Sequence, residues 1–152
     1  MNNTQNFCTF VLKDELFGVP VERVQEVIRY QEMTRVPLVP QAVRGLINLR
    51  GQIVTAIDLR RRLSMSERPA DQLPMNVVVR TDEGALSMLV DDIGDVIEVE
   101  DATFEPPPET LKGMAREMIQ GVHKLHVGLM HVLDIEKACR TTDVEEAVTS
   151  PR

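Results

Sequence analysis

Short apolar segments that alternate with polar turn residues run along most of the chain. Residues 7–12 and 16–20 have strand-like composition and flank a polar turn, so they predict a β-hairpin. Residues 75–80 and 85–90 flank the turn Thr81-Asp82-Glu83-Gly84 and predict a second hairpin of the same design. Four further apolar segments have the length of strands, and they lie at 46–49, 53–57, 118–122 and 129–135.

Helical periodicity is limited to short segments. It occurs at 59–63 and 135–139, and ambiguously at 21–28, where apolar residues recur at helical spacing. Asp58 and Asp134 each follow a strand pattern and directly precede one of these helical segments. Aspartate is a preferred helix N-cap, so both residues are predicted to cap helices rather than to act as catalytic acids.

The two halves of the chain repeat one another. The aligned pairs are 43–49 with 119–125 and 56–59 with 132–135, both at an offset of 76, and 24–28 with 93–97 at an offset of 69. A short-stranded unit without long helices favours closure into a small barrel, because closure removes exposed sheet edges. We therefore predict a mainly β protein in which two similar barrels share an interface.

Composition places the chain among globular proteins. Of its 152 residues, 43% are hydrophobic and 27% are charged, which is enough apolar material for a core. No apolar run approaches the length of about 18 to 20 residues that a membrane helix needs, and the first residues lack a signal-peptide pattern, so we expect a cytoplasmic protein. Cys8 and Cys139 have no metal-binding or disulfide spacing and are expected to be buried and reduced.

Charge is distributed unevenly along the chain. Residues 1–70 hold ten Lys and Arg against seven Asp and Glu, a balance of +3, whereas residues 71–152 hold seven against seventeen, a balance of −10. An acidic half and only five aromatic residues argue against a nucleic-acid-binding surface. Protein partners fit this charge pattern better.

Motifs for catalysis are missing from the sequence. No two glycines are separated by one residue, so the usual dinucleotide loop and phosphate loop are excluded, and no Gly-x-Ser-x-Gly elbow occurs. His123, His126 and His131 are the only metal-like cluster, but they lack acidic or Cys ligands at a recognised spacing. We expect surface or rim histidines, no metal, no cofactor and no enzymatic activity.

Several sequence motifs carry a resemblance to a known family. In chain order they are Gly18-Val19, Val24-Gln25-Glu26-Val27, Thr34-Arg35-Val36-Pro37, Gly45-Leu46-Ile47-Asn48-Leu49-Arg50-Gly51 and Ile57-Asp58-Leu59-Arg60. This series resembles the CheW family of chemotaxis coupling proteins, and the resemblance covers about residues 7–140. The chain departs from the family pattern at Pro20 and at Thr55-Ala56.

The resemblance implies a specific architecture. CheW-like proteins consist of two intertwined, five-stranded, SH3-like β-barrels with short helices. By this resemblance, residues 1–140 form a single domain with two pseudo-repeated subdomains, about 7–66 and 75–140, between which strands can be exchanged. Residues 141–152 are expected to form a flexible acidic tail.

The resemblance also implies a function. CheW-like proteins are non-catalytic adaptors that couple the cytoplasmic tips of chemoreceptors to the regulatory domain of the histidine kinase CheA, in the cytoplasm at membrane receptor arrays. No nucleic acid and no membrane insertion are implied. The family's receptor-binding positions correspond to Val24, Glu26, Gly45 and Arg50 in this chain. We predict an ion pair between Glu26 and Arg50, and a kinase contact on a barrel end away from the receptor groove.

Other readings stay open at this point. Gly45 could be a simple turn glycine, and Arg50 could be a structural arginine that ties a turn to a neighbouring strand. For the whole chain, the alternatives are a small nucleic-acid-binding β-barrel, which charge and aromatic content disfavour, or an undetected enzyme, which the missing motifs disfavour.

Overall fold

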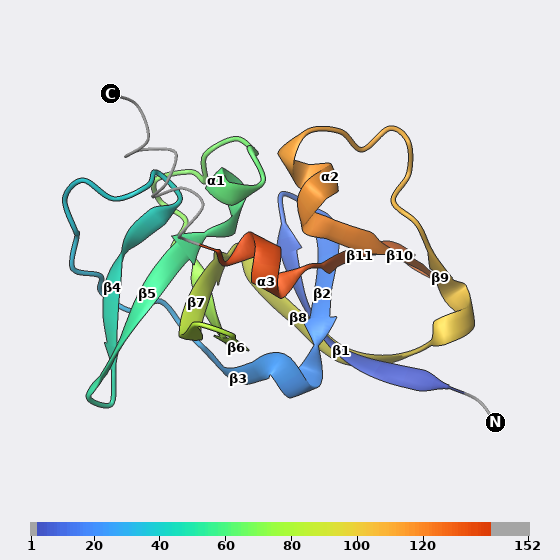
Figure 1. The fold of residues 1–152 in the computed structure, drawn as a ribbon, viewed down its shortest axis with the longest axis horizontal. Helices are drawn as coiled ribbons and strands as arrows, with labels where there is room; N and C mark the ends of the chain where they lie inside the picture. Colours follow the sequence, from blue (N-terminus) through green and yellow to red (C-terminus); the bar gives the residue numbers. More distant parts are fainter. Residues whose placement is uncertain (1–2, 141–152) are drawn as a thin grey trace.

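Residues 3–140 are described in the computed structural model of the protein, and short strands dominate them (Figure 1). The strands are β1 (Thr4–Leu12), β2 (Glu15–Pro20), β3 (Val24–Ile28), β4 (Val43–Leu49), β5 (Gln52–Asp58), β6 (Met75–Thr81), β7 (Gly84–Val90), β8 (Asp92–Glu100), β9 (Phe104–Glu105), β10 (Ile119–Leu125) and β11 (Gly128–Leu133). The helices are α1 (Leu59–Arg62), α2 (Met114–Met118) and α3 (Ile135–Ala138), with 3₁₀ turns at Val21–Arg23 and Asp101–Thr103.

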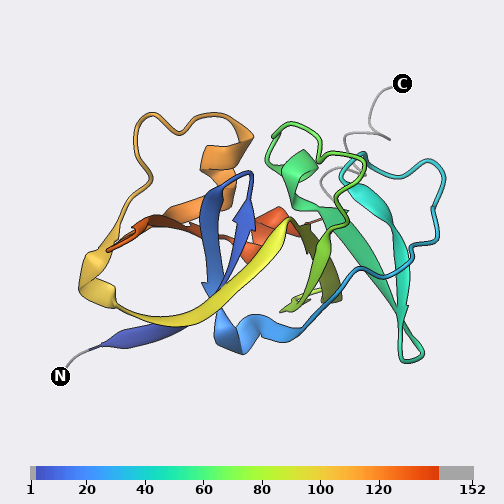
Figure 2. The same ribbon diagram turned by 180° about the vertical axis from the view of Figure 1, so that it is seen from behind.

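The strands form two sheets that lie next to each other (Figures 1 and 2). The first sheet has the strand order β8-β1-β2-β11-β10-β9, and the second sheet has the order β3-β6-β7-β5-β4. The predicted mainly β fold is confirmed. The first sheet has six strands rather than the predicted five because the two-residue strand β9 pairs with β10 at Val122 and His123.

The internal duplication is visible in the elements themselves. Strand β4 and strand β10 are 76 residues apart at both ends, and so are helices α1 and α3. The β1–β2 and β6–β7 hairpins match at an offset of 69, since Phe10 pairs with Phe17 and Val79 pairs with Leu86. Each sheet also holds one parallel pair, β11 with β2 and β5 with β7. The two halves therefore repeat one fold.

Each sheet combines strands from both halves of the sequence. The β1–β2 hairpin joins β8, β10 and β11 from the second half, and the β6–β7 hairpin joins β3, β4 and β5 from the first half. The largest hydrophobic core accordingly draws Phe10 and Val19 from the first sheet and Val77 and Met88 from the second. Two smaller cores each belong to one sheet, one around Ile47, Val54 and Leu89 and the other around Phe7, Met130 and Val132.

Two local predictions are corrected. The ambiguous helical pattern at 21–28 is a 3₁₀ turn followed by strand β3, because hydrogen bonds to β6 outweigh a weak helical periodicity. The predicted strand at 118–122 begins only at Ile119, and the preceding residues form helix α2, which the sequence pattern missed. The predicted tail at 141–152 lies outside the described residues. The division into subdomains at about 7–66 and 75–140 stays a prediction.

Within residues 3–140, none of the helices is long and apolar enough to span a membrane.

Candidate functional site

Arg50 lies at the tip of the β4–β5 hairpin. Leu49 pairs with Gln52, so Arg50 and Gly51 form a two-residue turn, and both have positive φ, 50° and 91°. Positive φ at both central positions is typical of the turn type that matches the twist of a hairpin. The Gly51 N–H donates to the Asn48 side-chain oxygen at 2.8 Å and holds the turn. The sequence Asn-Leu-Arg-Gly therefore presents an arginine at a projecting loop.

The predicted ion pair between Glu26 and Arg50 is confirmed. Arg50 Nη2 lies 2.5 Å from Glu26 Oε2, and this hydrogen bond raises the pKa of Arg50 above its ordinary value. The Arg50 side chain is 76% exposed, whereas that of Glu26 is 18% exposed. Exposed pairs contribute little to folding because water screens them. Most of the Arg50 side chain remains open to solvent.

The ion pair also connects the two edges of the second sheet. Glu26 belongs to β3 and Arg50 follows β4, and these two strands stand at opposite ends of the strand order. The alternative role of Arg50, tying a turn to another strand, is thus compatible with the geometry. A structural role and a binding role can be separated only by measuring folding and binding in the same variants.

Gly45 is a mid-strand glycine, and its interpretation as a turn glycine is wrong. It is buried in β4 at an irregularity in the pairing with β5. The next residue, Leu46, exchanges two backbone hydrogen bonds of 2.8 Å with Thr34. A Cβ atom on Gly45 would lie 2.6 Å from the Thr34 carbonyl oxygen, closer than real Cβ contacts allow. Glycine is required here because the segment around Thr34, which is bridged to Leu46, lies directly against the strand at this position.

Val24 is half-buried at the start of β3, where it pairs with Val79 of β6 and packs against the largest core. The structure thus brings Glu26 and Arg50 into contact, places Val24 on the same strand as Glu26, and puts Gly45 beneath Thr34. All four residues belong to the second sheet or to the hairpin at its edge.

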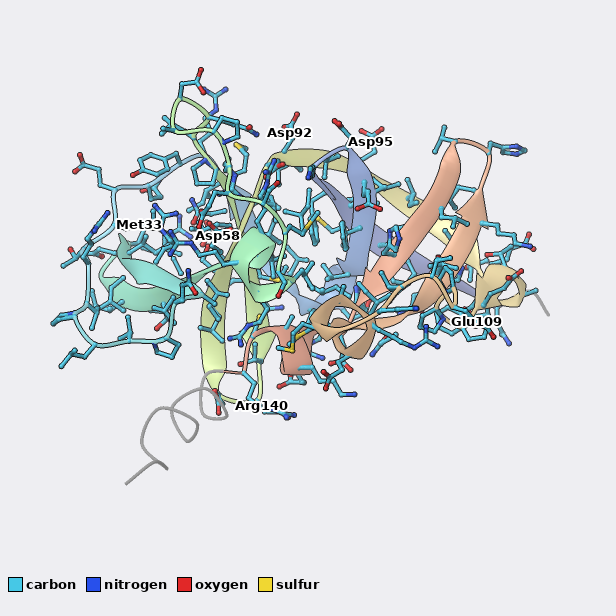
Figure 3. The ribbon with its side chains drawn as sticks, turned by 90° about the horizontal axis from the view of Figure 1, so that it is seen from above. Met33, Asp58, Asp92, Asp95, Glu109 and Arg140 are labelled. Carbon is cyan, nitrogen blue, oxygen red and sulfur yellow. The ribbon has the colours of Figure 1, made fainter. Side chains whose placement is uncertain are left out.

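A buried ionic cluster joins the second sheet to the first. It consists of Asp58, Arg60, Arg68 and Asp91, and we refer to it as the seam cluster. Asp58 is fully buried at the end of β5 and lies 3.3 Å from Arg68 (Figure 3). Asp91, between β7 and β8, lies 2.9 Å from both Arg60 Nε and Arg68 Nε. Reasoning from the sequence found only the capping role of Asp58, which is confirmed by its hydrogen bond from the Arg60 N–H at 3.0 Å.

The seam cluster also reaches the first hairpin. The Lys13 N–H, in the β1–β2 turn, donates to Asp91 at 2.8 Å. Burial alone would raise the pKa of Asp91, but hydrogen bonds from Arg60, Lys13 and Arg68 outweigh burial and lower it. The pKa of Arg60 is raised, chiefly by its hydrogen bond to Asp91. Asp91 is therefore held in its charged form at the junction of the two sheets.

The histidines do not form a metal site. His123 is buried between Phe7 and Phe104, with Nδ1 2.8 Å from Thr103 Oγ1, so the prediction of a surface or rim histidine is wrong for this residue. His131 donates to the Leu16 carbonyl at 3.1 Å, and His126 is exposed. In the described part of the chain, no group of three His, Cys, Asp or Glu is arranged to hold a metal ion.

The cysteines behave as predicted small apolar residues. Cys8 and Cys139 are buried and unpaired. Burial raises the pKa of Cys139 to about 12 and also raises that of Cys8. A thiol that stays protonated at neutral pH is a poor nucleophile.

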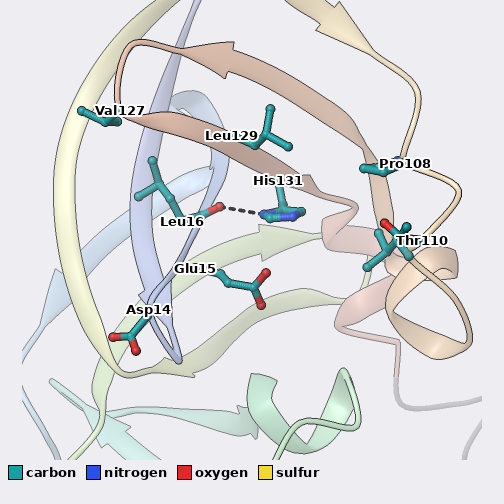
Figure 4. Close-up of a pocket in the computed structure, with 9 residues that line it drawn as sticks. Asp14, Glu15, Leu16, Pro108, Thr110, Val127, Leu129 and His131 are labelled. Atoms are coloured by element: carbon teal, nitrogen blue, oxygen red, sulfur yellow. Dashed lines mark hydrogen bonds between the residues drawn. The ribbon is translucent and has the colours of Figure 1, made fainter.

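A cavity of about 610 Å³ lies on the first sheet (Figure 4). Its walls come from β2, β11 and the loop before α2, and they include Leu16, Leu111, Leu129 and His131. Val127, at the rim, is 85% exposed. This cavity and the Glu26–Arg50 pair therefore occupy different sheets.

Comparison with known proteins adds independent information. Residues 6–142 match the CheW-like domain family. The chemotaxis protein CheW of Treponema pallidum is 29% identical over 142 residues, covering 91% of this chain and 84% of the relative. CheW of Klebsiella aerogenes is 31% identical over 133 residues, covering 88% and 80%. The crystal structure of the scaffolding protein TtCheW from Thermoanaerobacter tengcongensis is similar, with a TM-score of 0.80, 25% identity and coverage of 91% and 92%.

Proposed function

The chain belongs to the CheW-like domain family and is a chemotaxis coupling adaptor, and we propose that it holds the cytoplasmic tip of a chemoreceptor on the second sheet and the regulatory domain of CheA on the first. The receptor tip is helical, and a helix can lay an apolar face into a groove whose polar rim sets its register. We propose that Val24, Glu26, Gly45 and Arg50 form this receptor-binding site.

The exposure of Arg50 is the observation that carries the receptor site. A guanidinium has five N–H donors, and Glu26 occupies only part of this set. The hairpin turn and the ion pair together fix the direction of a side chain that is otherwise free to bind. Half-buried Val24 and the more exposed Val27 supply apolar surface on β3. A receptor carboxylate or carbonyl could then pair with the remaining donors of Arg50.

Gly45 supports this site indirectly. Thr34 covers Gly45, and the missing side chain leaves room for the segment at 33–34. Gly45 therefore offers no surface of its own to a partner. We propose that replacing Gly45 weakens receptor binding by displacing this segment and strand β4.

The decisive experiment measures binding and folding in the same variants of Arg50. We expect Arg50→Ala to weaken binding of a receptor-tip fragment about tenfold while thermal unfolding stays close to wild type. Arg50→Lys should also be impaired, since an ammonium cannot reproduce the planar fork that pairs with Glu26 and a second group. Isothermal titration calorimetry and thermal melting provide the two measurements.

Lys124→Ala is the matched control for Arg50→Ala. Lys124 is 65% exposed and pairs with Glu105 at 2.8 Å on the first sheet, so its loss removes a similar ion pair elsewhere. It should leave receptor binding unchanged. Normal receptor binding by Arg50→Ala, or a loss that merely follows global unfolding, would show that Arg50 has only a structural role.

We propose that CheA docks on the first sheet, beside the cavity of about 610 Å³. Val127 and Leu129 are exposed there, and apolar strand ends of this kind suit packing against a second, homologous barrel. Leu129→Glu should reduce binding of the CheA regulatory domain and spare receptor binding. Competition between the kinase domain and the receptor fragment in a titration would contradict separate surfaces.

The same proposal gives the protein no catalytic role. It acts in the cytoplasm, where its partners recruit it to receptor arrays, without inserting into the membrane and without binding nucleic acid. Purified protein should therefore show no nucleotide binding in a calorimeter.

A further inference from the structure

Strand β3, part of the proposed receptor site, begins at a three-way contact that combines one ion pair with a backbone hydrogen bond. Arg23, the residue before Val24, pairs with the carboxylate of Glu136 in helix α3. We propose that Glu136 is a positioning residue that sets the position of β3, and with it Val24 and Glu26, by holding Arg23. This inference rests on the proposed function of Val24 and Glu26.

Arg23 is held in two directions at once. One guanidinium nitrogen pairs with Glu136 Oε2, and Nε donates to the Arg80 carbonyl at 3.0 Å. Arg80 returns a hydrogen bond of 3.2 Å to the Glu22 carbonyl. The turn at Val21–Arg23 is therefore fastened to the end of β6 as well as to α3.

Glu136 binds a third element through the same carboxylate. The Asp82 N–H, in the β6–β7 turn, lies 3.2 Å from Oε2 and 3.3 Å from Oε1. One side chain thus joins helix α3, the start of β3 and the β6–β7 turn. Among the described strands, β3 is an edge strand paired with β6 alone, so these contacts add to that pairing and to core packing in locating its first residue.

The other half of the protein contains a comparable contact, in which the helix supplies the base and the segment before the edge strand supplies the acid. Position 136 corresponds to Arg60, and position 82 corresponds to Lys13. There the carboxylate belongs to Asp91, directly before β8, and it accepts from the Arg60 side chain and the Lys13 N–H. Asp91 aligns at the offset of 69 with Glu22, one residue before Arg23, so the acid is shifted by one position. In both halves a helix residue, a residue just before an edge strand and a turn N–H meet at one carboxylate.

The contact between Arg60 and Asp91 is more buried than that between Arg23 and Glu136, and the two contacts therefore have different roles. The side chains of Arg60 and Asp91 are 8% and 7% exposed, whereas those of Arg23 and Glu136 are 35% and 33% exposed. Breaking the buried contact leaves an unpaired charge in the interior and strongly destabilises the fold. Breaking the more exposed contact lets water replace the lost partner. Glu136 can therefore be changed to move β3 without unfolding the protein.

The test replaces Glu136 and follows β3 directly. We expect Glu136→Ala to increase the hydrogen-exchange rates of amides at 22–28 and to weaken binding of the receptor-tip fragment about three- to tenfold. Thermal unfolding and binding of the CheA regulatory domain should change little. Glu136→Gln should have a smaller effect, because its amide oxygen can still accept from Arg23 and Asp82.

Exchanging the charges of Arg23 and Glu136 tests whether the ion pair itself restores receptor binding. Arg23→Glu and Glu136→Arg should each weaken receptor binding, since each places two like charges together. The double variant restores one acid and one base at this contact and should bind better than either single variant. Glu67→Ala is the matched control, because it removes another partly exposed carboxylate that pairs with Arg61, away from β3.

The outcomes separate this inference from the proposed function. If Arg50→Ala loses receptor binding while Glu136→Ala keeps it and β3 exchange is unchanged, the positioning role is wrong and the receptor site stands. If Glu136→Ala accelerates exchange in β3 but neither variant affects receptor binding, the receptor site is wrong. A double variant no better than the single variants would also overturn the positioning role.

Discussion

At the scale of single residues, Gly45 and Gly121 are selected by the backbone of an antiparallel neighbour that lies against them. They are 76 residues apart and occupy equivalent positions in β4 and β10. A Cβ on Gly121 would clash with the Glu105 carbonyl oxygen, as one on Gly45 would clash with that of Thr34. Neither strand could accept a side chain without moving its neighbour.

Replacing either glycine by alanine should destabilise the protein by about 1–3 kcal/mol, the usual cost of overpacking. Urea denaturation measures this loss. Gly45→Ala should also weaken receptor-fragment binding more than its stability loss explains, whereas Gly121→Ala should not. Equal effects of the two variants on receptor binding would show that Gly45 has no special link to the site.

His123 makes stability depend on pH. Burial lowers its pKa below the ordinary value of 6.5. At pH values between the folded and the unfolded pKa of His123, the unfolded chain binds more protons than the folded chain. The contribution of His123 to the free energy of unfolding is therefore fully present above pH 6.5 and is lost as pH falls through the folded pKa. Denaturation at several pH values should show this loss, and NMR should report the lowered pKa. His123→Asn, whose amide can still reach Thr103, should flatten the profile; an unchanged profile would assign the effect to other groups.

At the scale of elements, equivalent helices are stabilised in different surroundings. Asp58 caps α1 and Asp134 caps α3, where its side chain accepts from the Lys137 N–H at 3.1 Å. Both capping predictions are confirmed. The Asp58 side chain also pairs with Arg68 of the seam cluster and with Arg44, whereas the Asp134 side chain makes the capping hydrogen bond from Lys137.

Removing the two caps should therefore have unequal costs. Asp134→Ala should cost about 0.5–2 kcal/mol, the value of a helix cap. Asp58→Ala should cost about 3–5 kcal/mol, because it also leaves buried arginines without their partner. Asp58→Asn, which keeps the cap and loses the charge, separates the two contributions in denaturant unfolding. Equal losses for both alanine variants would mean that the seam cluster adds nothing beyond the cap.

At the scale of the whole molecule, exchanged hairpins make the two sheets depend on each other. The β1–β2 hairpin completes a sheet built from the second half, and the β6–β7 hairpin completes one built from the first. The largest core is shared between both sheets. Neither half of the sequence contains a complete sheet.

Fragments cut in the loop before β6 should behave accordingly. Residues 1–73 and 74–152, each alone, should give the circular dichroism of unfolded chains, because each lacks the hairpin that completes its sheet. Mixed together, they should regain β structure and form a one-to-one complex. Independent folding of either fragment would contradict this mutual dependence.

Most of the local elements and the family could be predicted from the sequence alone. Alternation of apolar and polar residues with turn residues located the hairpins, since strand periodicity is a property of neighbouring positions. The repeat at fixed offsets predicted two copies of one unit, and the motifs from Gly18 to Arg60 indicated the CheW-like family. The Glu26–Arg50 pair was predicted through that resemblance.

The tertiary structure alone decided which partners meet. Arg23 and Glu136 are 113 residues apart in the sequence, and Arg60 and Asp91 of the seam cluster are 31 residues apart. The sequence did not predict the burial of His123 or which segment lies against Gly45. The helical periodicity at 21–28 was ambiguous, and pairing with β6 makes β3 a strand. Periodicity along a chain records which face of an element is apolar, but not which distant element covers that face. That choice depends on the packing of a core shared by both halves.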